Sequence, residues 1–232
     1  MKHTLLLRLQ APMQAWGVQS HFVVRDSARE PTKSGVTGLL AAALGRSRDA
    51  PLEDLAALRM GVRVDREGRL MVDFHSAQKV VNAAGKVLRN AVISNRYYLA
   101  DAVFLVGLET ENIELLQQIQ YALQRPKWLL FLGRRAFPPA VPLWFPNGLH
   151  ESRGLIHALE NFPWLIAVPK SEYQRRLLPE KLRMIVEDQG GPMMRMDLPT
   201  SFAERTFTAN RFLVRYCQKP TEFYQEGGQA CS

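Results

Sequence analysis

The sequence has few cysteines and no long apolar run. Two cysteines in 232 residues, Cys217 and Cys231, cannot form the disulfide framework of a small secreted protein, and they are typical of a reducing compartment. The apolar start of the chain is interrupted at Arg8 and Gln10, which is too early for a signal-peptide core. No stretch approaches the roughly 20 apolar residues that span a bilayer. We therefore expect a cytoplasmic protein without a membrane segment.

Motifs for metal ions and nucleotides are also absent. The five histidines form no close pair on one helical face, and neither cysteine has a Cys-x-x-Cys partner. Residues 32–35 (TKSG) resemble the end of a phosphate-binding P-loop, but Thr32 stands where the motif requires a glycine. We therefore expect no metal ion, no cofactor and no nucleotide hydrolysis.

The charge of the chain is basic and unevenly distributed. The sequence has 30 Lys and Arg against 22 Asp and Glu, a net charge of +8, which favours a polyanionic partner. Residues 101–124 carry acidic but no basic side chains, whereas the segments on both sides carry basic but no acidic ones. The alternative is that these blocks of like charge arose by chance along a solvated surface and bind nothing. The basic residues of these two segments are Lys79, Lys86, Arg89, Arg96, Arg125, Lys127, Arg134 and Arg135.

Hydrophobic periodicity predicts a mixed α+β fold. Helices are expected after Thr32, ending at Gly45, and after Asn112, ending before Pro126, with a short helix over 52–58. Residues 79–98 contain too few apolar side chains for a core and predict a protruding hairpin, here called the finger. Strands are expected over 4–9, 61–65, 70–74, 102–108 and 128–132, with a turn at 66–68 joining the second and third. This order predicts a ferredoxin-like (RRM-like) βαββαβ domain with the hairpin inserted.

A cluster of prolines between residues 138 and 146, followed by Asn147-Gly148, predicts a linker or long loop. Beyond it, apolar runs over 164–168, 182–186 and 207–217 predict a smaller β-rich part. We therefore expect a ferredoxin-like domain over 1–140, with the hairpin at about 76–100, and a second part over 141–232.

Three short segments have residue types suited to nucleic acid. Gln14 and Trp16 follow the first strand, where an indole can stack on a base, or can instead support the loop. Lys33, Ser34 and Gly35 begin a helix, whose free N–H groups favour an anion. Arg134 and Arg135 follow a glycine and suit phosphate contacts, unless a nearby carboxylate pairs with them.

His75 offers an enzymatic alternative. Together with Tyr97 or Tyr98 and a lysine, it has the groups needed for metal-independent attack by a ribose 2′-OH. A hydrogen-bonded structural histidine explains the same residue, and the sequence does not show that these side chains meet.

Five short segments, taken together and in order, are more specific than any one of them. They are residues 9–17 (LQAPMQAWG), 31–40 (PTKSGVTGLL), 73–75 (DFH), 96–104 (RYYLADAVF) and 132–135 (LGRR). In this order they resemble the CasD-type subunit of the type I-E CRISPR Cascade complex, a family in the RAMP superfamily. The chain departs from the family at Ala11, where glycine is usual, and at Ala136-Phe137, which replace a small or cysteine-containing pair.

The resemblance implies a non-catalytic RNA-binding subunit that caps the 5′ handle of the CRISPR RNA through a fold with a β-hairpin thumb. It implies contacts with the adjacent backbone subunit and the large subunit that reads the PAM, and with target DNA through the complex, in antiviral defence. An endoribonuclease that processes repeat RNA is the alternative, because the equivalent subunit of another subtype has that activity. The expected RNA-binding residues are Gln14, Trp16, Arg25, Lys33, Ser34, Gly35, Lys79, Lys86, Arg89, Arg96, Arg134 and Arg135.

Overall fold

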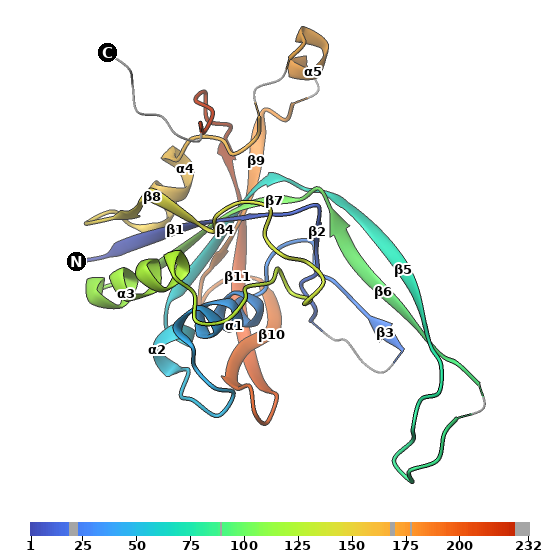
Figure 1. The fold of residues 1–232 in the computed structure, drawn as a ribbon. Helices are drawn as coiled ribbons and strands as arrows, with labels where there is room; N and C mark the ends of the chain where they lie inside the picture. The colour runs from blue at the N-terminus through green and yellow to red at the C-terminus, as the bar shows by residue number, and fades with distance from the viewer. Residues whose placement is uncertain (19–22, 89, 168–169, 177, 226–232) are drawn as a thin grey trace.

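The structure, a computed structural model, describes residues 1–18, 23–88, 90–167, 170–176 and 178–225 (Figure 1). It is a mixed α+β fold dominated by antiparallel sheets. The larger sheet has seven antiparallel strands in the order β10-β11-β9-β4-β7-β1-β8. These strands are β1 (His3–Gln10), β4 (Arg59–Arg66), β7 (Val103–Thr110), β8 (Trp144–His150), β9 (Lys181–Glu187), β10 (Met193–Ser201) and β11 (Thr206–Gln218).

Helices cover both faces of the larger sheet because its central strands are apolar on both sides. On β1, Leu5, Leu7 and Leu9 pack toward α1 (Lys33–Leu44) and α3 (Ile113–Gln124), whereas Leu6 packs toward α4 (Leu155–Asn161). The short helices α2 (Glu53–Ala56) and α5 (Glu172–Arg176) complete the set in the part of the chain that the structure describes. The core therefore has two layers of side chains, one on each face of the sheet.

Helix α1 begins and ends where its sequence predicts. Thr32 is the N-cap and its hydroxyl accepts a hydrogen bond from the amide of Gly35. Gly45 adopts a left-handed conformation at φ 74° and its N–H caps the last carbonyls of the helix. Helix α3 likewise begins after the predicted cap Asn112, which accepts from Leu115. Both ends of α1 are thus fixed by local hydrogen bonds.

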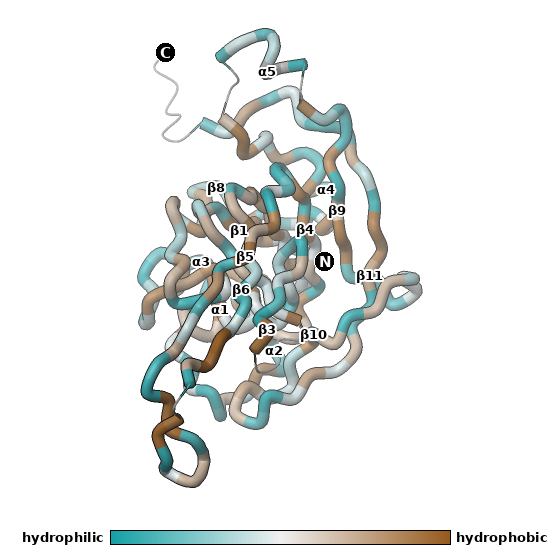
Figure 2. The backbone as a smooth tube through the Cα atoms, turned by 90° about the vertical axis from the view of Figure 1, so that its right-hand side faces the viewer, coloured by the Kyte–Doolittle hydropathy of each residue, from teal (hydrophilic) through white to brown (hydrophobic). Residues whose placement is uncertain are grey.

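The finger is a long two-stranded ribbon that extends away from the rest of the fold (Figure 1). Strands β5 (Arg69–Ala77) and β6 (Val92–Ala100) pair along their whole length, and Val81 and Val87 bridge near the tip. Two short strands, β2 (Met13–Gln14) and β3 (Val24–Arg25), pair with the other edge of β6 at the base. Apolar stretches alternate with polar ones along the ribbon (Figure 2), and Phe74 is 65% exposed. A protruding hairpin is confirmed, but it is longer than predicted: its strands pair from Arg69 and Ala100 outward, so the finger comprises residues 69–100 and includes the predicted strand 70–74.

Several predicted elements are wrong. A turn does join β4 and β5 where predicted, but the two strands do not pair as a hairpin, because β4 pairs with β7 and β9 while β5 belongs to the finger. Residues 128–132 are not a strand; β8, which begins inside the proline cluster and contains Pro146, pairs with β1 instead. Helix α4 and strand β10 were not predicted at all. Strands β9, β10 and β11 extend the same sheet as β4.

The described part of the chain contains no helix that is both long and apolar enough to cross a membrane. Within the same residues, no group of three or more His, Cys, Asp and Glu side chains is arranged to hold a metal ion.

Candidate nucleic-acid interface

Three arginines meet at the base of the finger, and we call them the arginine cluster: Arg25, Arg96 and Arg134. Arg25 on β3 and Arg96 on β6 are direct partners in the parallel pairing of these strands. Arg134 comes from a loop more than 30 residues later, and its Nη2 donates to the carbonyls of Tyr97 at 2.7 Å and Arg25 at 3.2 Å. The guanidinium of Arg134 therefore joins β3 and β6 where the finger leaves the fold.

Gly133 allows the loop to reach this position. Its φ is +92°, and a Cβ there would lie 1.6 Å from the carbonyl oxygen of Ala15. The amide of Ala15 also donates to the carbonyl of Leu132 at 3.1 Å. No other residue fits such a close approach of two backbones, so the glycine directly fixes where Arg134 lies.

The arginine cluster carries an excess of positive charge. Burial is the main cause that lowers the pKa of Arg134. The positive charges of Arg96 and, to a smaller extent, Arg25 lower it further. Asp73 and Asp26 oppose this effect, but among the described residues no carboxylate lies within ion-pair distance of any of the three guanidiniums. Like charges held together without such a partner favour an anion between them. Phosphate is the anion that arginine binds best in this geometry.

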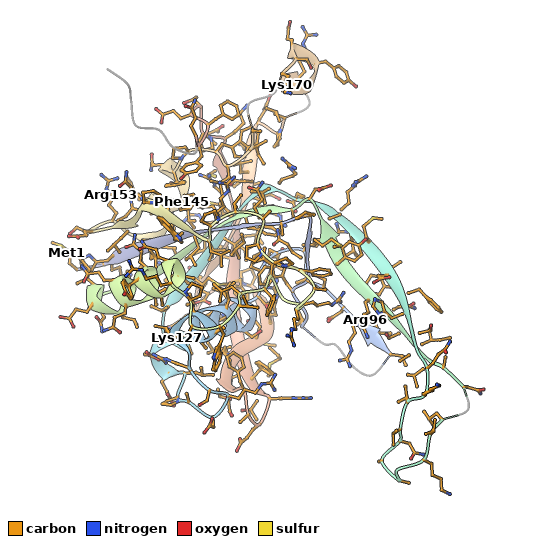
Figure 3. The ribbon with its side chains drawn as sticks, viewed as in Figure 1. Met1, Arg96, Lys127, Phe145, Arg153 and Lys170 are labelled. Atoms are coloured by element: carbon orange, nitrogen blue, oxygen red, sulfur yellow. The ribbon has the colours of Figure 1, made fainter. Side chains whose placement is uncertain are left out.

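Exposed cations continue from the arginine cluster along the finger. Lys79 and Lys86 are exposed near its tip, and Arg135 is exposed next to Arg134. Arg89, also expected to bind RNA, lies outside the described residues. Figure 3 shows Arg96 at the start of this path, on the ribbon beside β3. The candidate interface therefore runs from the base of the finger toward its tip.

Gln14 and Trp16 are buried rather than presented to solvent. Trp16 is 1% exposed and packs on the start of α1, where a Cβ on Gly35 would lie 2.8 Å from its ring. The side chain of Gln14 donates to the carbonyls of Leu9 and Ala102. In this conformation Trp16 supports the loop, which is one of the two roles that the sequence allowed.

The start of α1 already holds an anion, which belongs to the chain itself. The amide of Lys33 donates to the Asp197 carboxylate at 2.9 Å, and Asp197 is 1% exposed. The ammonium of Lys33 is buried too, where it contacts the carbonyl of Leu58 and pairs with Glu187 at 3.0 Å. Ser34 is half-buried beside Thr32. Nothing near residue 33 in the sequence signals a carboxylate 164 residues away.

Burial raises the pKa of Asp197 to about 6, against an ordinary value of 3.8. The hydrogen bond from Lys33 and the charge of Arg195 act in the opposite direction but do not cancel the loss of water. The carboxylate at the start of α1 is therefore costly to keep charged.

The groups considered for RNA cleavage are not assembled. His75 Nε2 lies 2.5 Å from a carboxylate oxygen of Asp73, two residues away on the same strand. In the register of β5 and β6, His75 is opposite Ser94, whereas Tyr97 is opposite Val72 and therefore points to the other face of the ribbon. Tyr98 is opposite Met71, on the face of His75 but four residues away along the strand. No tyrosine–histidine pair forms here.

Known CRISPR proteins are similar to this chain in sequence. The family model described as CRISPR-associated protein (Cas_Cas5) matches residues 4–213. The CRISPR system Cascade subunit CasD of Escherichia coli (strain K12) is 33% identical over 158 residues, which cover 62% of this chain and 70% of that protein.

Two solved structures share the fold over nearly the whole chain. One, described as "Crystal structure of Cas protein", is 43% identical with a TM-score of 0.74, covering 93% of this chain and 95% of that one. The other, from a "CRISPR RNA-guided surveillance complex", is 31% identical with a TM-score of 0.76, covering 94% and 91%. With a family model spanning most of its residues, the chain belongs to the CRISPR-associated protein (Cas_Cas5) family.

Proposed function

We propose that this chain is a CRISPR RNA-binding subunit of a Cascade complex and that it holds the 5′ handle of the RNA along the finger. The observation that carries the proposal is the arginine cluster at the base of the finger, in a chain similar to a Cascade subunit. A handle is single-stranded, so cations can hold its phosphates while its bases remain free to be read. The finger and its base supply such cations in a row.

The residues that contact RNA in this proposal are the cations of the arginine cluster, its neighbour Arg135 and the finger; Arg96 and Arg134 are half-buried, and the other described members are exposed. The full set is Arg25, Arg96, Arg134, Arg135, Lys79 and Lys86, with Arg89 as an expected member. Gln14, Trp16, Lys33, Ser34 and Gly35 act by positioning, since most of them are buried around the start of α1. This division changes the sequence-based hypothesis in one respect: the residues around the start of α1 no longer contact RNA, whereas the predicted cations of the finger and its base keep that role.

The fold proposed for the RNA-binding part is ferredoxin-like. The strands β4-β7-β1-β8 with α1 and α3 follow the order of a βαββαβ unit. That unit includes β8 and so extends past residue 140; the division of the chain at 140 remains a prediction.

The partners proposed are CRISPR RNA, the neighbouring backbone subunit, the large PAM-reading subunit and, through the complex, target DNA. The matched relatives are named as a Cascade subunit and as part of an RNA-guided surveillance complex. The exposed apolar side chains of the finger, among them Val72 and Phe74, support a protein neighbour that covers them in the assembly. The location proposed for this subunit is the cytoplasm.

A direct test uses purified protein and fluorescently labelled handle RNA. Anisotropy should show tighter binding to the handle than to a scrambled RNA, with an affinity that falls as salt rises. Equal, weak binding to both RNAs at all salt concentrations would contradict the proposal.

We propose that the chain is non-catalytic toward RNA. The separation of His75 from Tyr97 and Tyr98 on the ribbon supports this role. Incubation with repeat RNA in EDTA tests it: intact RNA is expected, and discrete cleavage products that disappear in His75→Ala would establish the endoribonuclease instead.

A further inference from the structure

A second aromatic and basic site lies at the other end of α1, away from the arginine cluster and the finger. Here a pocket of about 350 Å³ opens between the helix, the segment after α3 and the turn between β10 and β11. This volume lies within the range of pockets that bind small ligands. Its lining includes Arg46, Arg48, Trp128, Arg205 and Phe207.

The aromatic side of the pocket is open to solvent. Trp128 is 50% exposed and Phe207 is 37% exposed, whereas the wall from α1 consists of Gly38, Ala41 and Ala42. Small residues on one side leave room for a flat ring to lie against the indole. Trp16 and Trp164, by contrast, are each 1% exposed and belong to the core.

The polar side of the pocket carries cations. Arg46 is paired with Asp54, but Arg48 and Arg205 are exposed and make no ion pair with the described residues. Arg205 has a φ of 57°, in the left-handed region, at the turn between β10 and β11. The turn brings a second unpaired guanidinium to the same pocket as Arg48, from a segment more than 150 residues later.

Trp128 is held in place by the end of α1. Its amide donates to the carbonyl of Ala42 at 3.3 Å, and the amide of Lys127 donates to that of Ala43 at 3.0 Å. Because these bonds satisfy the last carbonyls of the helix, the ring is presented from a fixed backbone. The exposure of Trp128 is therefore a consequence of the fold, whereas the apolar segment 128–132 had predicted a buried strand.

We propose that this pocket is a second site for single-stranded nucleic acid, in which a base stacks on Trp128 and flanking phosphates contact Arg48 and Arg205. Aromatic rings beside unpaired arginines are the combination that binds single strands without sequence preference. Charge complementarity favours this occupant over a neutral apolar segment, because the unpaired charges of the lining residues are all positive.

The second site is separate from the arginine cluster. The loop of Gly133 and Trp16 lies at the start of α1 and Trp128 lies at its end, so the 12 residues of the helix separate them by about 18 Å. Figure 3 shows Lys127 and Arg96 well apart. One nucleotide cannot contact both, and the second site is an additional contact along a strand or a contact with a different strand.

Tryptophan fluorescence tests the site directly, because Trp128 is half-exposed whereas Trp16, Trp144 and Trp164 are buried or partly buried. The probe is oligothymidine of about eight nucleotides, added to the whole protein. Saturable quenching is expected, and Trp128→Phe should abolish it. The double variant Arg48→Ala/Arg205→Ala should raise the midpoint at least about fivefold. The control Leu129→Ala removes the neighbouring side chain, which is 76% exposed and outside the pocket, and should leave the midpoint unchanged.

Three results would overturn the inference: no saturable quenching, an unchanged midpoint in the arginine variant, or equal quenching by a polyglutamate peptide, which would show an acidic protein segment as the occupant. The outcome is separable from the proposed function. Arg134→Ala acts on affinity for handle RNA, whereas the quenching lost in Trp128→Phe reports only on the environment of that indole.

Discussion

Replacing Arg134 by alanine is expected to weaken the binding of handle RNA by at least about tenfold. The guanidinium donates to the carbonyls of Tyr97 and Arg25 and so holds two strands of the finger base together, while its charge adds to that of Arg96. A single charge-assisted hydrogen bond to a phosphate contributes about 1.5–3 kcal/mol. Since about 1.4 kcal/mol is a factor of ten, the loss of one such contact lies between roughly tenfold and 150-fold.

The assay is fluorescence anisotropy of labelled handle RNA at several salt concentrations. Removing one phosphate contact to a single strand should reduce the slope of log affinity against log salt by about 0.7. Arg134→Lys keeps the charge but loses the planar fork, which leaves other N–H groups for a phosphate while Nη2 donates to the two carbonyls, so it should recover the slope and only part of the affinity.

Arg176→Ala is the matched control. It removes the same charge from α5, at the opposite end of the molecule from the finger (Figure 1), where Arg176 pairs with Glu172 on the surface. If Arg176→Ala weakens RNA binding as much as Arg134→Ala, or if a folded Arg134→Ala protein binds normally, the arginine cluster is not the RNA site.

Three further outcomes are expected. The amides of residues 79–88 should exchange rapidly in the free protein and become protected in the assembled particle; strong protection in the isolated chain would show a stable core element. Trp16→Ala should lower the free energy of unfolding by about 3–5 kcal/mol in a denaturant titration, because a fully buried ring is lost; a small loss with selective damage to handle binding would show base contact instead. Since the folded pKa of Asp197 is about 6 against 3.8, its contribution to stability is present below about pH 4 and lost as pH rises through about 6. Asp197→Asn should therefore remove that pH dependence and raise stability at pH 7 by up to about 3 kcal/mol; an unchanged pH profile in thermal melts would contradict this.

Helices and central strands were predictable because their signals are local. Thr32, Gly45 and Asn112 mark the ends of α1 and α3 by hydrogen bonds within a few residues. The apolar run of β7 fits a strand buried on both faces. The finger was predictable from its shortage of apolar residues suited to a core.

Strand pairing was not predictable, because it depends on partners far along the chain. The apolar segment 128–132 resembles a strand, yet β1 pairs with β8, which begins within the proline cluster, and Trp128 and Leu129 remain exposed. The candidate site shows the same limit. Gly133, Arg134 and Arg25 could be identified by residue type, but their meeting with Arg96 depends on the short pairing of β3 with β6. The residues around Lys33 predicted that an anion binds there, and only the fold reveals that this anion is the carboxylate of Asp197.

The contact between Lys33 and Asp197 also bears on how the protein is made. The buried ammonium of Lys33 pairs with the carboxylate of Glu187, and the amide of Lys33 donates to the carboxylate of Asp197. During synthesis Lys33 therefore emerges before partners that lie up to 164 positions later. At about 5–20 residues per second that delay is roughly 8–33 s. Strand β4 is also left incomplete, because its edge that pairs with β9 stays unpaired until residue 187 has left the ribosome. A nascent chain in this interval exposes an unpaired strand edge and an uncompensated charge, so its yield in the cell should depend on chaperones more than that of a protein whose partners are close in sequence.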